Sequence, residues 1–464
     1  MNSMIYLGVL ASCLTLSCGQ DRAMLALKAN KVPALTSRIE ADVYFQTNEK
    51  RSVSPFTEGL LPGTNRFLFS FPEGQTGAVK IELRALTKNN CTVGSALYEK
   101  NISGLVTISD ETTFNEYQLA EGTTSGLLSV WGISQNDVWA VGLDGKILHW
   151  DGLCWIDYSD SKLKLGGFAS VHGSSSSDVW AVGSQRLIRH WNGKIWESAL
   201  MQIDLSIGDA QSVLAFDPKD AWIAGYSGDS FILYRWNGTS WFEMKKPAAS
   251  AIESKNYNDL QNVPPPTYND KLFTIAGTSS QNMLLAGTSR NDAMPSPKPG
   301  LMYNLGTTQA PNFAYREKVT GSNDIYTNDT KADYQRAWTA AADDYWFGVS
   351  GDNNPMEGPA IVHWDGKNML KQVLGSDPNV VVNAIGGIKT GSNYDMWVSS
   401  VDRVKRINRL YRNAGSPKFD IVTDGAFSGK EVTAIWGISA NDVWFVGLGG
   451  LRVHWDGSKY TTYP

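Results

Sequence analysis

Histidine and aspartate side chains are the groups through which this chain could do chemistry, because together they supply general bases and metal ligands. The sequence holds five histidines, and four of them stand directly before a tryptophan. Six of the aspartates stand two residues before a tryptophan. The histidines are His149, His172, His190, His363 and His454, and the aspartates are Asp137, Asp178, Asp220, Asp344, Asp395 and Asp442.

Both sets of residues belong to a repeated phrase. The phrase runs over Ser129–Gly152, returns almost intact at Ser170–Gly193 and Ala434–Gly457, and is looser at four places between them. A unit of about 40 residues cannot bury its apolar face alone, so the copies must pack on one another. Seven units therefore form one assembly.

Each unit is predicted to form four short strands. In the first unit the apolar stretches are Leu128–Ile133, Val138–Gly142, Lys146–Trp150 and Cys154–Tyr158. Asp144-Gly145, between the second and third stretches, is a strong hairpin signal, because a type I′ turn needs positive φ at both central residues. The unit is therefore expected to be an antiparallel meander.

Seven such sheets favour a closed β-propeller, in which neighbouring blades cover each other's faces. An open solenoid would need polar capping units, whereas the terminal copies here match the phrase best. All 17 tryptophans lie between Trp131 and Trp455, and rings of this size are typical of buried packing. The prediction is an all-β chain with a seven-bladed propeller over 127–464. We expect six tryptophans to be buried between blades: Trp139, Trp180, Trp222, Trp346, Trp397 and Trp444.

The repeat limits what the histidines and aspartates can do. Equivalent residues in different blades are kept apart, because packed sheets lie about 10 Å from one another. The histidines are therefore expected to pack or to bond a neighbouring blade, without forming a metal site or a Ser-His-Asp triad. The aspartates are expected to cap backbone N–H groups of the first turn. A ring of carboxylates that binds cations is the alternative. We predict no catalytic residue, no metal and no cofactor.

The first 20 residues contain a short apolar run that ends in small residues, which indicates an export signal. The run resembles a bacterial lipoprotein signal, in which a cysteine after small residues is lipidated. The resemblance implies a signal peptide at 1–18 and lipidation at Cys18, with Cys13 as the weaker choice. Gly19-Gln20 lacks a retention aspartate, which implies the outer membrane. A plain secretion signal or a buried strand is the alternative.

Residues 23–119 alternate between apolar and polar side chains in short runs, such as Ile39–Phe45 and Val79–Leu86. About seven short strands in about 100 residues predict an immunoglobulin-like β-sandwich. The region resembles the small sandwich domains that follow bacterial lipidation sites. After signal removal only Cys91 and Cys154 remain. Because they fall in different predicted domains, we expect two unpaired buried thiols; the alternative, a disulfide, would require the two domains to dock closely.

Charge gives little support for a nucleic-acid partner. The net charge is −5 over 464 residues, and the densest basic run is Arg403–Arg409. This run is expected to be a solvated surface, so nucleic-acid binding is disfavoured.

The propeller units resemble those of tectonin-type lectins, which share a Val-Trp-x-Val strand and a following aromatic-rich turn. Tyr234–Trp241 carries the second part of that pattern. The resemblance implies binding of a glycan or lipopolysaccharide. Sialidase-type aspartate boxes differ, because they place a residue between Asp and Gly and a Ser or Thr before the Asp.

Long insertions are expected on one face of the propeller. Turns after second strands and links between blades share a face, and the insertions there are Lys245–Asp270, Arg290–Gly300, Gly321–Asp333 and Gly351–Gly358. Loops on a rigid scaffold are where binding usually resides, although surface drift is the alternative. The candidate contacts are Tyr268, Asn291, Asp292, Lys298, Asp352, Asn353, Asn354 and Glu357.

These expectations combine into one functional hypothesis. The chain is predicted to be a non-catalytic, exported, lipid-anchored envelope protein whose propeller binds a protein or a glycan. The alternative is a propeller-scaffold enzyme, of glycoside hydrolase or lyase type, that acts on envelope polysaccharide. An enzyme should show a deep axial pocket lined by several acids or arginines, whereas a binding platform should show a surface built from loops.

Overall fold

The computed structural model describes most of the chain, and the fold is stated for those residues only. They are 23–45, 50–56, 60–71, 74–88, 90–102, 107–120, 123–160, 166–185, 187–198, 208–228, 230–244, 268–291, 298–304, 313–316, 332–351, 358–365, 369–377 and 379–463. The predicted signal peptide, with Cys18, lies outside these ranges. None of the helices within them is long and apolar enough to cross a membrane.

The chain folds as two units, one formed by 1–120 with 150–158 and the other by 121–149 with 159–464. The first unit holds a three-stranded sheet of order β4-β1-β7 and a five-stranded sheet of order β3-β2-β5-β6-β8. Its strands are β1 (Met24–Val32), β2 (Arg38–Phe45), β3 (Lys50–Phe56), β4 (Gly63–Ser70), β5 (Gly77–Leu86), β6 (Thr92–Ile102), β7 (Thr107–Thr113), β8 (Asn115–Glu116) and β9 (Gln118–Leu119).

The core of the first unit follows from strand alternation, because successive side chains point to opposite faces of a sheet. Leu25 and Leu27 of β1 are buried, as are Ile81 and Leu83 of β5, and all four join Phe67 of β4 in one apolar cluster. Two sheets that share a core make this unit a β-sandwich. Its immunoglobulin type stays a prediction.

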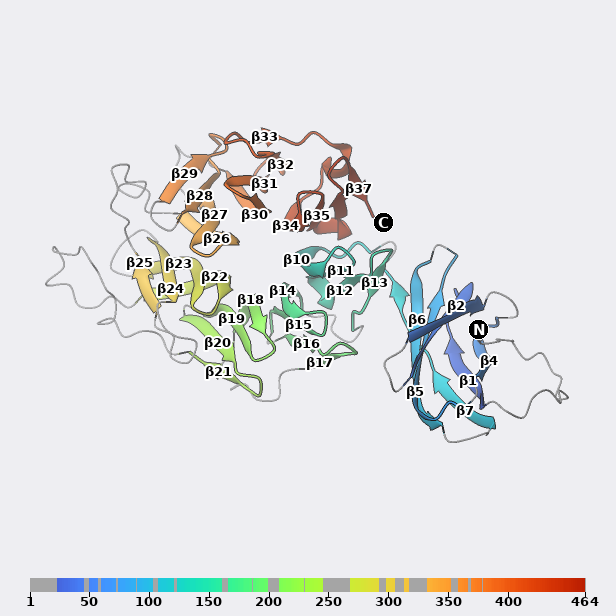
Figure 1. The fold of residues 1–464 in the computed structure, drawn as a ribbon. Helices are drawn as coiled ribbons and strands as arrows, with labels where there is room; N and C mark the ends of the chain where they lie inside the picture. Colours follow the sequence, from blue (N-terminus) through green and yellow to red (C-terminus); the bar gives the residue numbers. More distant parts are fainter. Residues whose placement is uncertain are drawn as a thin grey trace. The chain divides into compact units, whose positions relative to one another are not determined.

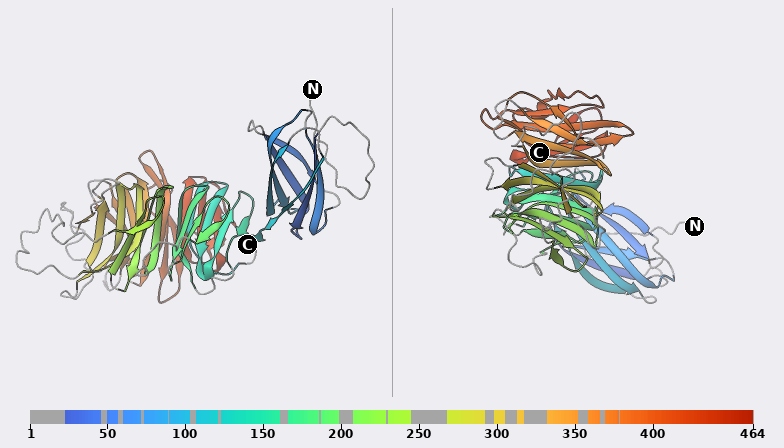
Figure 2. Two further views of the ribbon diagram at one scale, coloured as in Figure 1. Left: turned by 90° about the horizontal axis from the view of Figure 1, so that it is seen from below. Right: turned by 90° about the vertical axis from the view of Figure 1, so that its left-hand side faces the viewer.

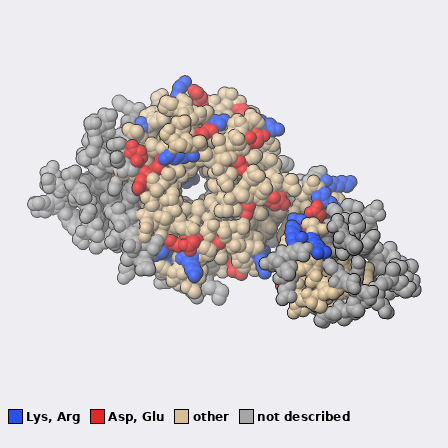
Figure 3. All heavy atoms as spheres, in the orientation of Figure 1, with Lys and Arg blue, Asp and Glu red and all other residues tan. Residues whose placement is uncertain are grey.

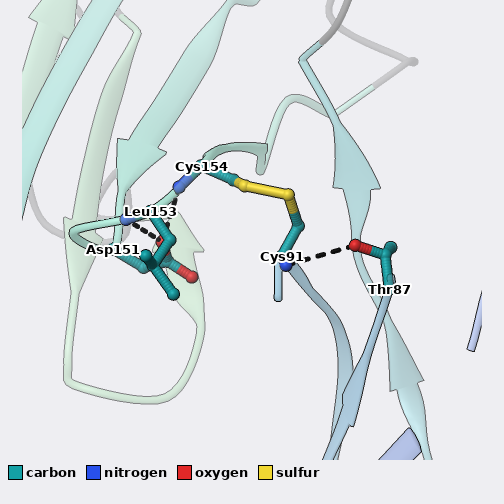
Figure 4. The surroundings of a disulfide bond; sticks show 5 residues. All are labelled: Thr87, Cys91, Asp151, Leu153 and Cys154. Atoms are coloured by element: carbon teal, nitrogen blue, oxygen red, sulfur yellow. Dashed lines mark hydrogen bonds between the residues drawn. A yellow bond between two sulfur atoms is a disulfide. The ribbon is translucent and has the colours of Figure 1, made fainter. Parts of the chain in front are cut away.

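Cys91 and Cys154 form a disulfide within the first unit, with their Cα atoms 5.5 Å apart (Figure 4). The expectation of two free thiols was wrong. It placed Cys154 in the propeller, whereas the segment 150–158 belongs to the first unit, where β9 pairs with β13 (Trp155–Asp157). Asp151 Oδ1 accepts the backbone N–H of Cys154 at 2.9 Å, which fixes the turn that presents this cysteine.

The described strands β10–β37 form seven four-stranded antiparallel meanders, the blades, which confirms the seven-bladed propeller. Strand β13 belongs to the sheet of the first blade although its segment is counted with the first unit, and one pair, Ser350–Val381, joins the sheets of blades five and six. Blades one to four comprise β10 (Leu127–Ser134), β11 (Asp137–Gly142), β12 (Ile147–Trp150) and β13; β14 (Phe168–Ser175), β15 (Asp178–Gly183), β16 (Ile188–Trp191) and β17 (Trp196–Ser198); β18 (Asp209–Asp217), β19 (Asp220–Ser227), β20 (Ser230–Trp236) and β21 (Trp241–Glu243); and β22 (Tyr268–Ser279), β23 (Asn282–Asn291), β24 (Lys298–Asn304) and β25 (Phe313–Arg316). Blades five to seven comprise β26 (Ala332–Ala341), β27 (Asp344–Gly351), β28 (Ala360–Trp364) and β29 (Met369–Val373); β30 (Val380–Thr390), β31 (Asn393–Asp402), β32 (Asn408–Arg412) and β33 (Asp420–Ile421); and β34 (Val432–Ser439), β35 (Asp442–Gly447), β36 (Arg452–Trp455) and β37 (Tyr460–Thr462).

The ring closes between the first and the last blade, where β10 and β34 lie side by side (Figure 1). Thr433 Oγ1 donates to the carbonyl oxygen of Leu127 across this junction at 2.5 Å. The seventh blade takes all four strands from the C-terminal end of the chain, so the ring needs no strand from the N-terminus. Strand β9 instead adds to the outer edge of the first blade's sheet through β13.

Turn chemistry follows the sequence closely in the first blade. Asp144 and Gly145, in the 3-10 turn Leu143–Gly145, have φ values of 56° and 66°. Both values are positive, as the hairpin signal predicted. The equivalent turn of the seventh blade uses Gly449 and Gly450, and a Cβ added at Gly450 would lie 2.0 Å from the Thr123 carbonyl oxygen. Only glycine fits there.

The second strand of each blade carries the main packing residue. All six expected tryptophans are buried, and five of them are at most 1% exposed, which confirms the prediction. The ring of Trp139 lies 5.0 Å from that of Trp196 in the next blade, and the ring of Trp180 lies 5.0 Å from that of Trp241, both edge to face. Such pairs add attraction beyond the burial of apolar area.

Candidate functional site

The propeller presents its turns on two faces. In Figure 2 its strands lie side by side across the thickness of the disc, with turns at both ends. Chain alternation puts turns after second strands and links between blades on one face, which we call the linker face. Turns after first and third strands form the other, the hairpin face.

The structure places three of the predicted contact residues at the linker-face end of blade four. Tyr268, the first residue of β22, pairs with Asn291, the last residue of β23, and Lys298 at the start of β24 pairs with Ser289. The predicted insertion Arg290–Gly300 is shorter than expected, because both strands extend into it. The other candidates lie outside the described residues: Asp292, Asp352, Asn353, Asn354 and Glu357.

Histidine, tryptophan and aspartate form a recurring cluster inside single blades, which we call the Asp-Trp-His module. In blade two, Trp180 pairs across the strands with His190, and the two rings stack at 4.0 Å. His190 Nε2 lies 2.7 Å from Asp178 Oδ1. Three further blades repeat the contact between His Nε2 and Asp Oδ1 at 2.8 Å: His149–Asp137, His363–Asp344 and His454–Asp442.

Arginine takes the histidine position in two blades. Arg235 Nε bonds Asp220 Oδ1 at 2.9 Å while its guanidinium lies over the Trp222 ring. Arg412 does the same toward Asp395 and Trp397 in blade six. A cation over an aromatic face is attracted by the ring quadrupole. Blade four lacks the module altogether, with Asn282, Leu284 and Tyr303 at the equivalent register positions.

The module corrects the role expected for the aspartates. Their carboxylates bond the strand-three cation or imidazole, and Asp178 and Asp220 also accept the indole N–H of their own tryptophans. The turns are capped instead by the residue at their start, as when Ser175 Oγ accepts the Ser177 N–H. Four of the histidines likewise bond an aspartate of their own blade, whereas His172 Nδ1 accepts the backbone N–H of Ala215 in the neighbouring blade at 3.2 Å, as expected.

Ser174, His190 and Asp178 are not arranged as a hydrolytic triad, because the serine and the histidine both bond the aspartate. Ser174 Oγ donates to the carboxylate at 2.5 Å and His190 bonds the other oxygen, so the imidazole does not touch the hydroxyl. A nucleophilic serine would need the imidazole as its direct base. Burial alone would raise the pKa of Asp178, but the bonds from His190, Ser174 and Trp180 together lower it. The module therefore holds an ionised carboxylate as a structural anchor.

In blade five the aspartate of the module also bonds side chains of blade six. Asp344 accepts Lys389 Nζ at 2.6 Å and Tyr394 OH at 2.7 Å, in addition to His363. Burial and the bond to Asp344 raise the pKa of Tyr394, which keeps the phenol protonated. Across the described ranges, no group of three or more His, Cys, Asp and Glu side chains could hold a metal ion.

The axis of the propeller is an open channel, visible as the opening at the centre of the disc in Figure 3. It encloses about 180 Å³ and is lined by residues from the innermost strands of all seven blades. The lining is mostly aliphatic and hydroxyl-bearing, and its described residues include no aspartate or glutamate and a single arginine, Arg336. His172 also lines it; burial lowers the pKa of its imidazole to about 4, so the ring is neutral near pH 7.

Comparison with known proteins supports the propeller fold and assigns no family to the chain. No protein-family model matches the chain, and no curated protein matches it in sequence. Among solved structures, YCF48 from Cyanidioschyzon merolae is similar at 13% identity and a TM-score of 0.50, over 74% of this chain and 99% of that one. YCF48 bound to D1 peptide gives 14% identity and 0.49, over 73% and 96%. The GH74 enzyme of Niastella koreensis gives 12% identity and 0.41, over 81% and 48%.

Proposed function

We propose that this chain is an exported envelope protein whose propeller binds a protein or a glycan without carrying out chemistry. The observation that carries the proposal is where the chemical side chains lie. Four of the five histidines and their aspartates are held in Asp-Trp-His modules, and the described lining of the axial channel contains no carboxylate. A glycosidase needs a pair of carboxylates that flank the bond to be cleaved.

The disulfide supports the exported part of the proposal. Disulfides persist in oxidising compartments and are rare where thiols are kept reduced. Cys91 is 5% exposed, so its end of the bond is buried within the fold. The apolar leader that ends at Cys18 agrees with export and with attachment to the outer membrane by a lipid.

Lipid attachment is tested at the mature N-terminus. Mass spectrometry of the protein purified from membranes should find Cys18 as the first residue, carrying acyl chains. An intact leader followed by an unmodified Cys18 would contradict the anchor and leave the binding proposal standing.

Binding is assigned to the linker face over blades four and five. Strands β22 and β23 are among the longest of the propeller, and their paired ends carry Tyr268 and Asn291 beyond the register reached in blades one and two. The paired ends of these two strands therefore extend blade four on the linker face.

A binding assay distinguishes binding from catalysis. The chain from residue 19 onward is immobilised and exposed to envelope extract and, separately, to a glycan array. The expected result is a bound protein or glycan that is recovered with unchanged mass after prolonged incubation. A glycan that is shortened or unsaturated after incubation would show an enzyme and would contradict the proposal.

A further inference from the structure

The turns that follow the second strands of blades six, seven and one are held at the same level of the linker face. In each blade the first residue of this turn donates its backbone N–H to the carbonyl oxygen of the residue before the first strand. The three bonds are Arg403 to Asn379 and Leu448 to Glu431, both at 3.0 Å, and Leu143 to Gly126 at 2.8 Å. The three turns are neighbours, because the first strand of blade seven lies between those of blades six and one.

These turns expose aliphatic side chains. Val404 is 70% exposed, more than any other large apolar residue in the described part of the chain. Ile407 in the same turn, Leu448 in blade seven and Leu143 in blade one are exposed as well. Leu448 and Leu143 meet over Gly126, since a Cβ added to this glycine would lie 2.7 Å and 3.2 Å from their methyl carbons. We call these four side chains the apolar strip.

The turn of blade six places positive charge beside the apolar strip. Arg403, Lys405 and Arg406 are all exposed. Two carboxylates reach this turn, those of Asp377 and Asp402, and both pair with Lys405 Nζ. Three basic side chains against two carboxylates leave the turn with a net positive charge.

The neighbouring turns do little to offset this charge. The turn of blade seven, Leu448–Gly450, contains no charged residue. The turn of blade one contains one carboxylate, that of Asp144, which accepts Ser125 Oγ at 3.0 Å. Lys430, in the link between blades six and seven, is exposed and adds a further cation.

Arg406 occupies a backbone conformation that favours glycine. Its φ is 57°, and the positions that close the equivalent turns of blades one and seven are Gly145 and Gly450, with φ values of 66° and 70°. A side chain at positive φ costs free energy, which glycine avoids. Blade six keeps an exposed arginine at this position although glycine would fit better, which indicates a role for the side chain at the surface rather than in the fold.

We propose that the turns of blades six, seven and one dock the propeller on an anionic phospholipid membrane. The apolar strip enters the boundary between head groups and acyl chains, while Arg403, Lys405 and Arg406 meet the lipid phosphates. Such a surface binds through buried apolar area together with attraction to anionic lipids. Turn tips held at one level suit a flat bilayer better than an acidic peptide, which usually binds in a groove or along a sheet edge.

The inference goes beyond the partner site at blades four and five and shares only the linker face with it. A propeller that rests on a bilayer through blades six, seven and one turns this face toward the membrane. The partner is therefore expected in or on the same membrane. Docking through the turns does not require the lipid proposed at Cys18.

Flotation with lipid vesicles tests the docking, with the chain from residue 19 onward so that Cys18 and any acyl chain are absent. The chain should bind vesicles of phosphatidylcholine with phosphatidylglycerol, less so as salt is added, and not vesicles of phosphatidylcholine alone. Arg406→Gly should weaken binding severalfold through the lost charge, and it should fold because glycine favours positive φ. The matched control is Lys194→Gly, which removes an exposed charge from the hairpin face and should bind as the unaltered chain does.

A fluorescent label tests whether the apolar strip enters the bilayer. After residue 18 the only cysteines are Cys91 and Cys154, which are joined in the disulfide. Val404→Cys therefore adds one free thiol for an environment-sensitive fluorophore, whose emission should move to shorter wavelength when phosphatidylglycerol vesicles are added. The same label on Ile438→Cys, at an exposed position of the hairpin face, should not respond.

Three results would overturn the proposal: no flotation with phosphatidylglycerol vesicles, equal binding by Arg406→Gly and Lys194→Gly, or equal responses of the two labels. Capture of an acidic protein by the blade-six turn without vesicle binding would overturn it as well. Vesicle binding is measured apart from partner capture. A chain that binds vesicles but captures no partner or glycan would contradict the proposed function and support the membrane inference.

Discussion

Trp180→Ala is expected to lower the free energy of unfolding of the propeller by roughly 3–5 kcal/mol, the range for a large aromatic removed from a core. Trp180 is 1% exposed, stacks on His190 and packs edge to face on Trp241 of the next blade. Its indole N–H also donates to Asp178 at 3.1 Å. The substitution therefore opens a cavity between two blades and removes a donor from a buried carboxylate.

Thermal or urea unfolding followed by circular dichroism measures the effect. Phe242→Ala is the matched control, because Phe242 belongs to the adjacent blade and is 38% exposed. It should change the stability by only a few tenths of a kcal/mol, as surface substitutions usually do. Equal stability of the two variants would show that the strand-two tryptophans do not hold the blades together.

Removal of the Cys91–Cys154 disulfide is expected to destabilise the first unit by about 4 kcal/mol. The bond closes a loop of 63 residues, and the entropy of closing such a loop in the unfolded chain gives this magnitude. The double variant Cys91→Ser, Cys154→Ser should lower the melting temperature of the first unit.

Two signals separate the units in this experiment. Tryptophan fluorescence reports mainly on the propeller, where 15 of the 17 tryptophans lie once Trp150 and Trp155 are counted with the first unit. Circular dichroism reports on both units. The transition that belongs to the first unit should shift clearly in circular dichroism and only weakly in tryptophan fluorescence. Two titratable thiols in the unreduced chain from residue 19 onward, or an unshifted transition in the variant, would contradict the structural role of the bond.

The propeller could be predicted from the sequence because short local patterns of apolar and turn residues determine how each blade folds and packs. The Val-Trp-Ala-Val strand around Trp139 is apolar on both faces, and Asp144-Gly145 fixes the next turn through positive φ. Such features depend on residues a few positions apart. Repetition in seven units then leaves few arrangements that bury every unit.

The role of the aspartates needed a contact that local patterns do not reveal. Asp178 meets His190 because strand register places the third strand beside the second, 12 residues on. A signal existed in the sequence: aspartate, tryptophan and a histidine or arginine occur together in six units and are lost together in blade four, at Asn282, Leu284 and Tyr303. Their joint presence indicates one cluster rather than three separate roles.

The disulfide escaped prediction for a related reason. Cys154 begins the fourth strand predicted for the first repeat unit, so the sequence assigns it to the propeller, whereas the pairing of β9 with β13 brings its segment into the first unit. The residues of an edge strand do not indicate which distant strand will pair with it. The binding loops are harder still to predict, because an insertion such as 292–297 has no counterpart in the other repeat units from which a contact could be inferred.

The most direct measurement of the proposed binding face is the affinity of the captured partner for two loop variants. One replaces 292–297 and 352–357, on the linker face, by Asp-Gly turns. The control replaces 305–312, between β24 and β25 on the hairpin face of the same blade, in the same way. The linker-face variant should bind about tenfold more weakly or worse, as expected when central contacts are removed, while the control binds as the unaltered chain does. Equal affinity of all three chains, or a loss in the control alone, would contradict binding through the linker face.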